Sequence, residues 1–398
     1  MTIPKSSLMN IIHDIHSLYP MECEDRSNIL SRVLVCMYEL EGGKDQAALA
    51  YQQMLPSLHL LRPISTSIDI NMENWQRHLG NTSCYRSYLG FFDDQIKRYG
   101  MEATMKYFLN AMPPSIHSQL QPIVHFSLGL EHDLPPMVSE GLAYLASTLD
   151  DGSSWLLQKP NLHHNQRNDN NTPISFDYLL FDCIQSDPRF NGIMEGGKPI
   201  AAKIKMLLKN HGPLLQTYLQ QWLVSSYDND EIQPQEIEQR MNEILNVALN
   251  ILQMKLLDEP THQLLASILA LRTLYDRQIM DLNILYQWIQ IQSLLMICTF
   301  IVQGRPSNTV HSIKQNYKQQ QHLMNNNNSD NNNNSNTSTT TTITHQDWSN
   351  CIQSFITANP PPSSILAMRS LWKAEQFIPL RSCLITANAL ASHVQQTV

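Results

Sequence analysis

The stretch that decides the fold is Leu282–Val302, LNILYQWIQIQSLLMICTFIV. A helix of this length makes about six turns, and nearly every face of it would be apolar. Such a helix must be buried by other parts of the protein. Its most apolar run, Ser293–Val302, has about half the length that a membrane-spanning helix needs. The stretch therefore predicts a central buried helix, and we expect no membrane span.

Amphipathic helices are predicted on the N-terminal side of this central stretch. Apolar residues recur at steps of three and four in Ile237–Leu256 and Leu264–Tyr275, and such steps return to one face of a helix. Ile29–Leu40 and the aromatic stripe Tyr85–Tyr99 follow the same rule. The sequence has no convincing run of alternating strand residues and no solenoid repeat. The pattern predicts an all-α fold.

One segment near the C-terminus differs in composition. Asn325–Asn336 contains nine Asn in twelve residues and leads into a Thr-rich run. A segment without apolar side chains cannot offset the entropy that is lost when its backbone is ordered. We therefore predict one large helical domain at 10–318, a disordered insert at 319–345, and a C-terminal helical segment at 346–395 that packs on the main domain.

Composition excludes several classes of function. The 398 residues include 27 Lys+Arg against 35 Asp+Glu, a net charge of −8, whereas nucleic-acid binding needs clustered Lys and Arg. We therefore predict no nucleic-acid partner. The 7 Cys form no Cys-x-x-Cys pair, which is typical of free thiols in a reducing compartment. Because the N-terminus also shows no apolar run of signal-peptide length, we expect a cytoplasmic protein. The oligomeric state stays open.

The candidates for chemistry are histidines, because the sequence has no glycine-rich dinucleotide loop, P-loop, nucleophile elbow or H-E-x-x-H motif. His125 and His262 lie in apolar helical stretches. Each is either a satisfied core residue or a general base that lines a pocket. His13 and His16 have a spacing that metal ligands use, but no partner set follows, so we interpret them as surface histidines and predict no metal site.

The aromatic stripe leaves two interpretations open. Its tyrosines, Tyr85 and Tyr88 among them, either belong to the core or form a platform for a flat aromatic ligand. We favour the core. The neighbouring pair Asp93-Asp94 is interpreted as part of a solvated helix face, not as a catalytic carboxylate pair.

Several strings together resemble the questin oxidase-like family. Each string is weak alone, but their order and approximate spacing agree with the family over about residues 25–375. The strings are Asn74-Trp75-Gln-Arg-His-Leu79-Gly80, Tyr85-Arg-Ser-Tyr88-Leu89-Gly-Phe-Phe92, Gln121-Pro122-Ile-Val-His125, Glu140-Gly-Leu-Ala-Tyr144, Thr261-His262 to Leu271-Arg272, and Val302-Gln-Gly304-Arg-Pro306.

The resemblance implies a helical oxidoreductase. In that family the activity is a Baeyer–Villiger-type oxygenation of an aromatic polyketide or related cyclic ketone with O2 and NADPH. The resemblance would give His125 and His262 the role of catalytic acid or base beside the ketone oxygen. It would make Trp75, Tyr85 and Tyr88 walls of a pocket for a small apolar aromatic substrate. Whether a flavin or a metal assists stays open.

The sequence departs from the family pattern at several histidines. An early N-H-x-x-H is replaced by Asn28-Ile29-Leu30-Ser31-Arg32, and an H-P pair by Gln121-Pro122. A late H-x-x-K aligns with Ser363-Ser364-Ile365-Leu366, whereas His311-Ser-Ile-Lys314 reproduces it at another place. These losses favour an alternative, in which a catalytically inactive or repurposed helical member binds an apolar ligand or a protein partner. A helical scaffold without a ligand pocket is the third possibility. Convergence of His125 and His262 on one apolar cavity would favour the enzyme.

Overall fold

The stretch Leu282–Val302 forms helix α12 (Leu282–Val302) and lies in the interior of the computed structural model. Trp288 and Phe300 on this helix have no exposed surface. By length and composition α12 could cross a membrane, but 78% of its apolar window is buried inside the protein. The prediction of a central buried helix is confirmed, and α12 is a core helix.

The structure describes residues 2–23, 26–61, 68–150, 174–193, 199–223, 232–306, 345–378 and 382–397. The other helices are α1 (Lys5–Leu18), α2 (Leu30–Glu39), α3 (Lys44–Met54), α4 (Tyr85–Tyr99), α5 (Met101–Ala111), α6 (Gln121–His132), α7 (Pro135–Thr148), α8 (Phe176–Tyr178), α9 (Ile200–Leu223), α10 (Pro234–Met254), α11 (Glu259–Asp276), α14 (His345–Thr357), α15 (Pro362–Ala374) and α16 (Ser382–Thr397). Short 3-10 or π turns are formed by Leu55–Ser57, Trp75–His78, Thr82–Cys84, Leu179–Ile184 and Pro188–Phe190.

The predicted all-α class is confirmed. The strands among the described residues are β1 (Glu22–Cys23) and β2 (Arg26–Ser27), which pair antiparallel as a short ribbon before α2. The predicted insert at 319–345 lies almost wholly outside the described residues.

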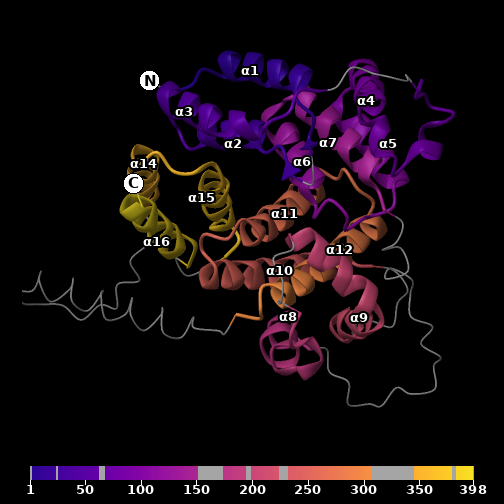
Figure 1. Ribbon diagram of the computed structural model, residues 1–398, viewed down its shortest axis with the longest axis vertical. Coiled ribbons are helices and arrows are strands. Elements are labelled where there is room, and N and C mark those ends of the chain that lie inside the picture. Colours follow the sequence, from indigo (N-terminus) through magenta and orange to yellow (C-terminus); the bar gives the residue numbers. More distant parts are fainter. Residues whose placement is uncertain are drawn as a thin grey trace, which may run out of the picture.

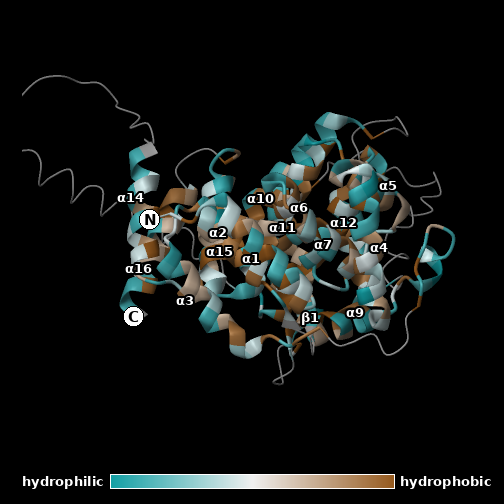
Figure 2. Ribbon diagram, turned by 90° about the horizontal axis from the view of Figure 1, so that it is seen from above, coloured by the Kyte–Doolittle hydropathy of each residue, from teal (hydrophilic) through white to brown (hydrophobic). Residues whose placement is uncertain are grey.

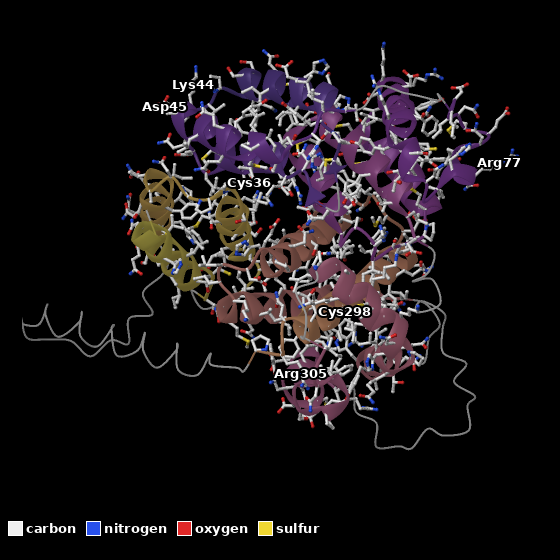
Figure 3. All side chains as sticks on the ribbon, in the orientation of Figure 1. Cys36, Lys44, Asp45, Arg77, Cys298 and Arg305 are labelled. Carbon is white, nitrogen blue, oxygen red and sulfur yellow. The ribbon has the colours of Figure 1, made fainter. Side chains whose placement is uncertain are left out.

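The helices pack around one hydrophobic core to which α2, α6, α7, α11, α12 and α15 all contribute. Helix α11 contacts α6, α10, α12 and α15, and α15 also contacts α2. In Figure 1, α1, α2 and α3 lie at the upper left, α4 and α5 at the upper right, and α14, α15 and α16 at the left of the molecule. Hydrophobic ribbon gathers towards the middle of the molecule in Figure 2. Side chains fill the spaces between the ribbons, including the buried Cys36 of α2 and Cys298 of α12 (Figure 3).

Helices α6 and α7 pack directly against each other, and their close approach depends on a glycine. A Cβ atom on Gly141 of α7 would lie 2.8 Å from Cβ of Phe126 on α6 and 3.1 Å from the backbone nitrogen of that residue. The missing side chain therefore lets the two helices approach. This approach positions the polar residues of both helices, which are described below.

Gly141→Ala is expected to destabilise the protein by about 1–3 kcal/mol, because the added methyl group overpacks the α6–α7 contact. Gly90→Ala is the matched control in another helix interior, since a Cβ there meets nothing within 4 Å. It should stabilise by up to about 1 kcal/mol, the usual gain of Ala over Gly in a helix. Urea unfolding of both variants measures the difference, and a loss of stability in Gly90→Ala equal to that in Gly141→Ala would contradict the packing argument.

Candidate active site

A small internal cavity lies where α2, α6, α11 and α15 meet. Its volume is about 20 Å³, roughly the space of one or two water molecules. Glu259 is the exposed member of its lining among otherwise buried or half-buried residues, so the cavity approaches the surface on that side. The lining residues are Ile29, Arg32, Cys36, Gln121, Val124, Leu128, Glu259, His262, Gln263, Ala266, Ser363, Leu366, Arg369 and Ser370.

Arg32 is the dominant charge of this cavity, which we call the Arg32 pocket. Its side chain has no exposed surface. Its Nη1 donates one long hydrogen bond, 3.4 Å, to Oε1 of Gln263, while Nε and Nη2 have no hydrogen-bond partner. Burial lowers the pKa of Arg32 to about 10. The guanidinium therefore remains a cation at neutral pH and presents two unused donors.

Two further polar groups of the Arg32 pocket are unpartnered. Nε2 of His262 lies 2.7 Å from the Leu256 carbonyl oxygen, which can only accept, so Nε2 carries the proton. The other ring nitrogen, Nδ1, is left without a hydrogen bond. Burial lowers the pKa of His262 despite the Leu256 carbonyl, so the ring is neutral. Oε1 of Gln121 is also buried without a partner. The pocket thus combines a fixed cation with two acceptors.

His125 belongs to a second buried polar cluster, which joins α1, α4, α6 and α7. Nε2 of His125 lies 2.6 Å from Oε2 of Glu140, and Nδ1 of His16 lies 3.1 Å from Oε1 of the same carboxylate. On its other side, Nε2 of His16 lies 3.1 Å from Oδ2 of Asp93. The Ser139 hydroxyl donates to Oδ1 of Asp93 at 2.5 Å. A buried carboxylate therefore holds two histidines at once.

Charge in this His16–Glu140–His125 cluster is nearly balanced. Burial alone would raise the pKa of Glu140, but the hydrogen bonds from His125 and His16 hold it below its usual value. Burial would lower the pKa of His16, yet its hydrogen bonds with Asp93 and Glu140 outweigh burial and raise it to about 10. Burial lowers the pKa of His125. An imidazolium thus lies between two carboxylates, with a neutral imidazole at the inner end.

Two interpretations of the sequence are corrected by this cluster. His16 is not a surface histidine, because α1 turns it inward together with Leu8, Ile12 and Ile15, whereas His13 is exposed. Asp93 is half-exposed but is engaged by His16 and Ser139, so it is more than a solvated carboxylate. The sequence interpretation also assigned no role to Glu140, whose position within an entirely buried helical segment was the available signal.

The candidate residues from the sequence occupy different places. His262 lines the Arg32 pocket, and His125 is buried but is not among the lining residues. Trp75 packs edge-on against Phe108 with the ring centroids 5.0 Å apart. The Tyr88 hydroxyl donates to the Trp75 carbonyl at 2.5 Å. Tyr85 is half-buried and packs against the core. None of these three aromatic residues lines the Arg32 pocket.

An acidic group beside the Arg32 pocket has the composition of a metal site. Ligand atoms of Glu39, Glu131 and His132 lie within 4.8 Å of one another. Arg369 already binds both carboxylates, with Nε 2.6 Å from Oε2 of Glu39 and Nη2 hydrogen-bonded to Oε2 of Glu131. Lys373 adds a second cation 3.2 Å from Oε1 of Glu39. Two cations therefore neutralise the two carboxylates.

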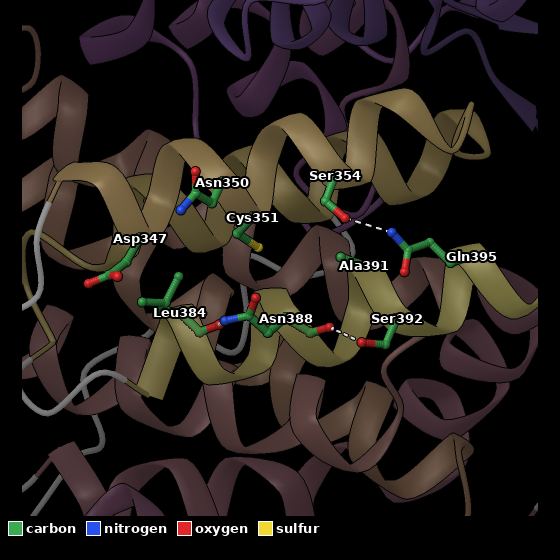
Figure 4. Close-up of a pocket in the computed structure, with 9 residues that line it drawn as sticks. All are labelled: Asp347, Asn350, Cys351, Ser354, Leu384, Asn388, Ala391, Ser392 and Gln395. Carbon is green, nitrogen blue, oxygen red and sulfur yellow. Dashed lines mark hydrogen bonds between the residues drawn. The ribbon is translucent and has the colours of Figure 1, made fainter. Parts of the chain in front are cut away.

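A larger cavity, of about 430 Å³, lies between α14 and α16. Its polar side chains bond within and between these helices, as where Gln395 donates to the Ser354 hydroxyl and the Ser392 hydroxyl donates to the Asn388 carbonyl (Figure 4). Asp347 is the charged residue of its lining. Among the described residues, none of the side chains that line this larger cavity has a buried polar atom without a hydrogen-bond partner. We therefore take the Arg32 pocket as the candidate active site.

Comparison with known proteins identifies the family. The sequence pattern of the Questin oxidase-like family matches residues 27–363, so the chain belongs to this family. The Baeyer-Villiger oxidase ptaJ of Pestalotiopsis fici is 24% identical over 153 residues. That alignment covers 36% of this chain and 34% of the relative, so the chain matches about a third of the relative's length.

The positions that depart from the family pattern meet in the Arg32 pocket. By the resemblance described above, Ile29 and Arg32 would stand where the family has the two histidines of N-H-x-x-H, and Gln121 where it has the histidine before proline. Ser363 and Leu366 would stand where it has the histidine and lysine of H-x-x-K. All of these residues line the pocket together with His262, which keeps the family's histidine. Residues from distant parts of the sequence thus meet at one place in the fold.

Protein stability should decrease from pH 6.5 to pH 8.5 because of His16. The pKa of His16 rises from 6.5 in the unfolded chain to about 10 in the folded protein, so its contribution is complete below pH 6.5 and is lost as the pH rises towards 10. Over the stated window the loss is on the order of 2 kcal/mol. Urea unfolding across this range measures it. His16→Gln should flatten the slope, whereas the matched control His13→Gln should keep it. An unchanged slope in His16→Gln would rule out this assignment.

Proposed function

We propose that this chain is an oxidoreductase that carries out a Baeyer–Villiger-type oxygenation of an aromatic polyketide or related cyclic ketone. The reaction takes ketone, O2, NADPH and a proton to lactone, water and NADP+. Membership of the Questin oxidase-like family and the partial similarity to a Baeyer-Villiger oxidase support the reaction class. The observation that carries the proposal is the group of unpartnered polar atoms of Arg32, Gln121 and His262 around one cavity.

Arg32 has the chemistry that the proposed reaction needs at the ketone oxygen. When a peroxide oxygen adds to a carbonyl carbon, negative charge develops on the carbonyl oxygen. Nε and Nη2 of Arg32 are unused donors fixed in a site without water contact. Such preorganised donors stabilise developing charge more strongly than they would in water. In the proposed reaction Arg32 therefore binds the carbonyl oxygen and stabilises the tetrahedral adduct.

His262 has the matching chemistry for proton transfer. Its neutral ring keeps Nδ1 free of protons because Nε2 donates to the Leu256 carbonyl. A bare imidazole nitrogen accepts a proton from a hydroperoxide as that group attacks the ketone. The same nitrogen can return the proton to the departing oxygen when the O–O bond breaks. His262 is the proposed acid–base residue, with Gln121 as an acceptor beside it.

Neither of the two cavities described above fits NADPH. The Arg32 pocket is too small for a nicotinamide ring, and the cavity between α14 and α16 has Asp347 where a pyrophosphate would require a cation. We therefore assign no step to residues that bind NADPH and treat it as the reductant supplied to the reaction. The Arg32 pocket is no larger than one or two water molecules, so in the proposed reaction only the reacting oxygen atoms of the substrate would enter it.

The assay is oxygen consumption by the purified protein with a questin-type anthraquinone and NADPH. The expected result is ketone-dependent uptake of O2 and a product one oxygen heavier by mass spectrometry. His262→Gln should reduce turnover roughly 10²- to 10⁴-fold, the usual contribution of an acid–base residue. His117→Gln is the matched control, because His117 is exposed and is absent from the pocket lining. Unchanged turnover in His262→Gln would remove His262 from the mechanism.

A second function is favoured by the substitutions in the pocket. Ile29, Ser363 and Leu366 offer no acid–base group where the family pattern has histidine or lysine. A repurposed member would bind the apolar ketone, or a protein partner, without oxidising it. The same assay separates the two functions: saturable ketone binding with no O2 uptake and no product supports the binding protein, and ketone-dependent turnover supports the enzyme.

A further inference from the structure

Arg32 is a buried cation without an ion-pair partner among the described residues, although the charge of Glu259 acts on it from beyond salt-bridge distance. Its guanidinium is fully buried, and none of the described acidic residues forms an ion pair with it. Glu259 also lines the pocket, but it is exposed and more than a salt-bridge distance away. A charge removed from water and left unpaired is strongly destabilising. The rest of the pocket therefore does not explain why an arginine is present.

Arg369 is the natural comparison, because it lines the same pocket and is also buried. It forms ion pairs with Glu39 and Glu131. The described residues thus supply ion-paired carboxylates to Arg369, whereas Arg32 has only the more distant charge of Glu259. Both guanidinium groups are removed from water, so Arg32 and Arg369 differ in their ion-pair partners and not in their burial.

The unused donors of Arg32 define the kind of partner that is missing. Nε and Nη2 lie on one edge of the planar guanidinium and point in nearly parallel directions. This edge binds the two oxygens of a carboxylate with two hydrogen bonds. The cavity beside it, about 20 Å³, has room for one or two oxygen atoms, so the anion would be no larger than formate or the carboxylate end of a longer molecule.

We propose that the Arg32 pocket is an oxyanion site that binds a small carboxylate-type anion, either free or as an ionised oxygen group of the substrate. The assignment to a substrate group rests on the proposed function, whereas binding of a free anion does not. In the absence of an anion, Arg32 lowers the stability of the fold. The bound anion supplies the missing charge and restores that stability.

The first experiment compares Arg32→Met with Arg369→Met by thermal unfolding in an anion-poor buffer. Methionine fills a similar volume without charge. Arg32→Met should raise Tm by several degrees, because it removes an unpaired buried cation. Arg369→Met should lower Tm, because it leaves Glu39 and Glu131 without their cation. A Tm of Arg32→Met clearly below that of the wild type would overturn the inference.

The second experiment measures anion binding directly. Sodium formate is titrated against the wild type at constant ionic strength, with sodium chloride as the balancing salt, and Tm and calorimetric heat are recorded. The wild type should gain Tm saturably with formate. Arg32→Met should show no gain, and Arg32→Lys should bind at least tenfold more weakly, because lysine lacks the planar fork. An equal formate response in wild type and Arg32→Met would refute the site.

A third comparison separates this inference from the proposed function. A keto acid and its methyl ester are tested for binding and for oxygenation. Tighter binding of the acid, lost in Arg32→Met, supports a substrate oxyanion in the pocket, while formate binding alone supports a free anion. Oxygenation without any anion preference or formate binding refutes the oxyanion site only, and formate binding without oxygenation refutes the proposed enzyme only.

Discussion

Charge buried inside an all-helical core is the constraint on which this structure depends. The inner faces of α2, α6, α7, α11 and α15 bring ionisable groups out of water, where each needs a partner. Glu140 is held between two histidines. Glu39 and Glu131 share Arg369. These pairings fix the relative positions of helices that apolar contacts alone would leave free to slide, because hydrogen bonds between charged groups tolerate little change in geometry.

Because Glu140, Glu39 and Glu131 all have partners, the missing partner of Arg32 is informative. The same fold that surrounds Glu140 with donors leaves Arg32 with one long hydrogen bond to Gln263. Buried polar groups in native proteins nearly always find partners. An exception therefore indicates a position that is kept for another purpose at the expense of stability. Gln121 and His262 present further unpartnered atoms to the same small cavity. Other buried atoms without a partner, such as the Tyr85 hydroxyl and Nε1 of Trp288, lie away from it.

Much of the fold could be predicted from periodicity, and the missed residues show where that signal stops. The apolar stretch of α12 determines its burial whatever surrounds it. The burial of His16 was missed because the spacing of the two histidines was considered without the apolar pattern of their helix. Leu8, Ile12 and Ile15 mark the buried face of α1, and His16 lies on that face whereas His13 does not. Glu140 and Arg32 could be recognised as buried charges within apolar helices, but their partners come from other helices. Only the packing of α1, α4, α6 and α7 shows which charged side chains pair with one another.

The meeting of the family departures in one cavity carries the argument about chemistry furthest. Ile29 and Arg32, Gln121, and Ser363 and Leu366 come from three separate parts of the sequence, at α2, α6 and α15, yet all line the cavity together with His262. A pocket ringed by histidines can pass protons in several directions, because imidazole gains and loses protons near neutral pH. Arginine holds its charge and passes none. The pocket of this chain is thus suited to holding negative charge, with His262 as the imidazole among its lining residues. Any reaction here would use Arg32 to stabilise an anion and His262 to move one proton.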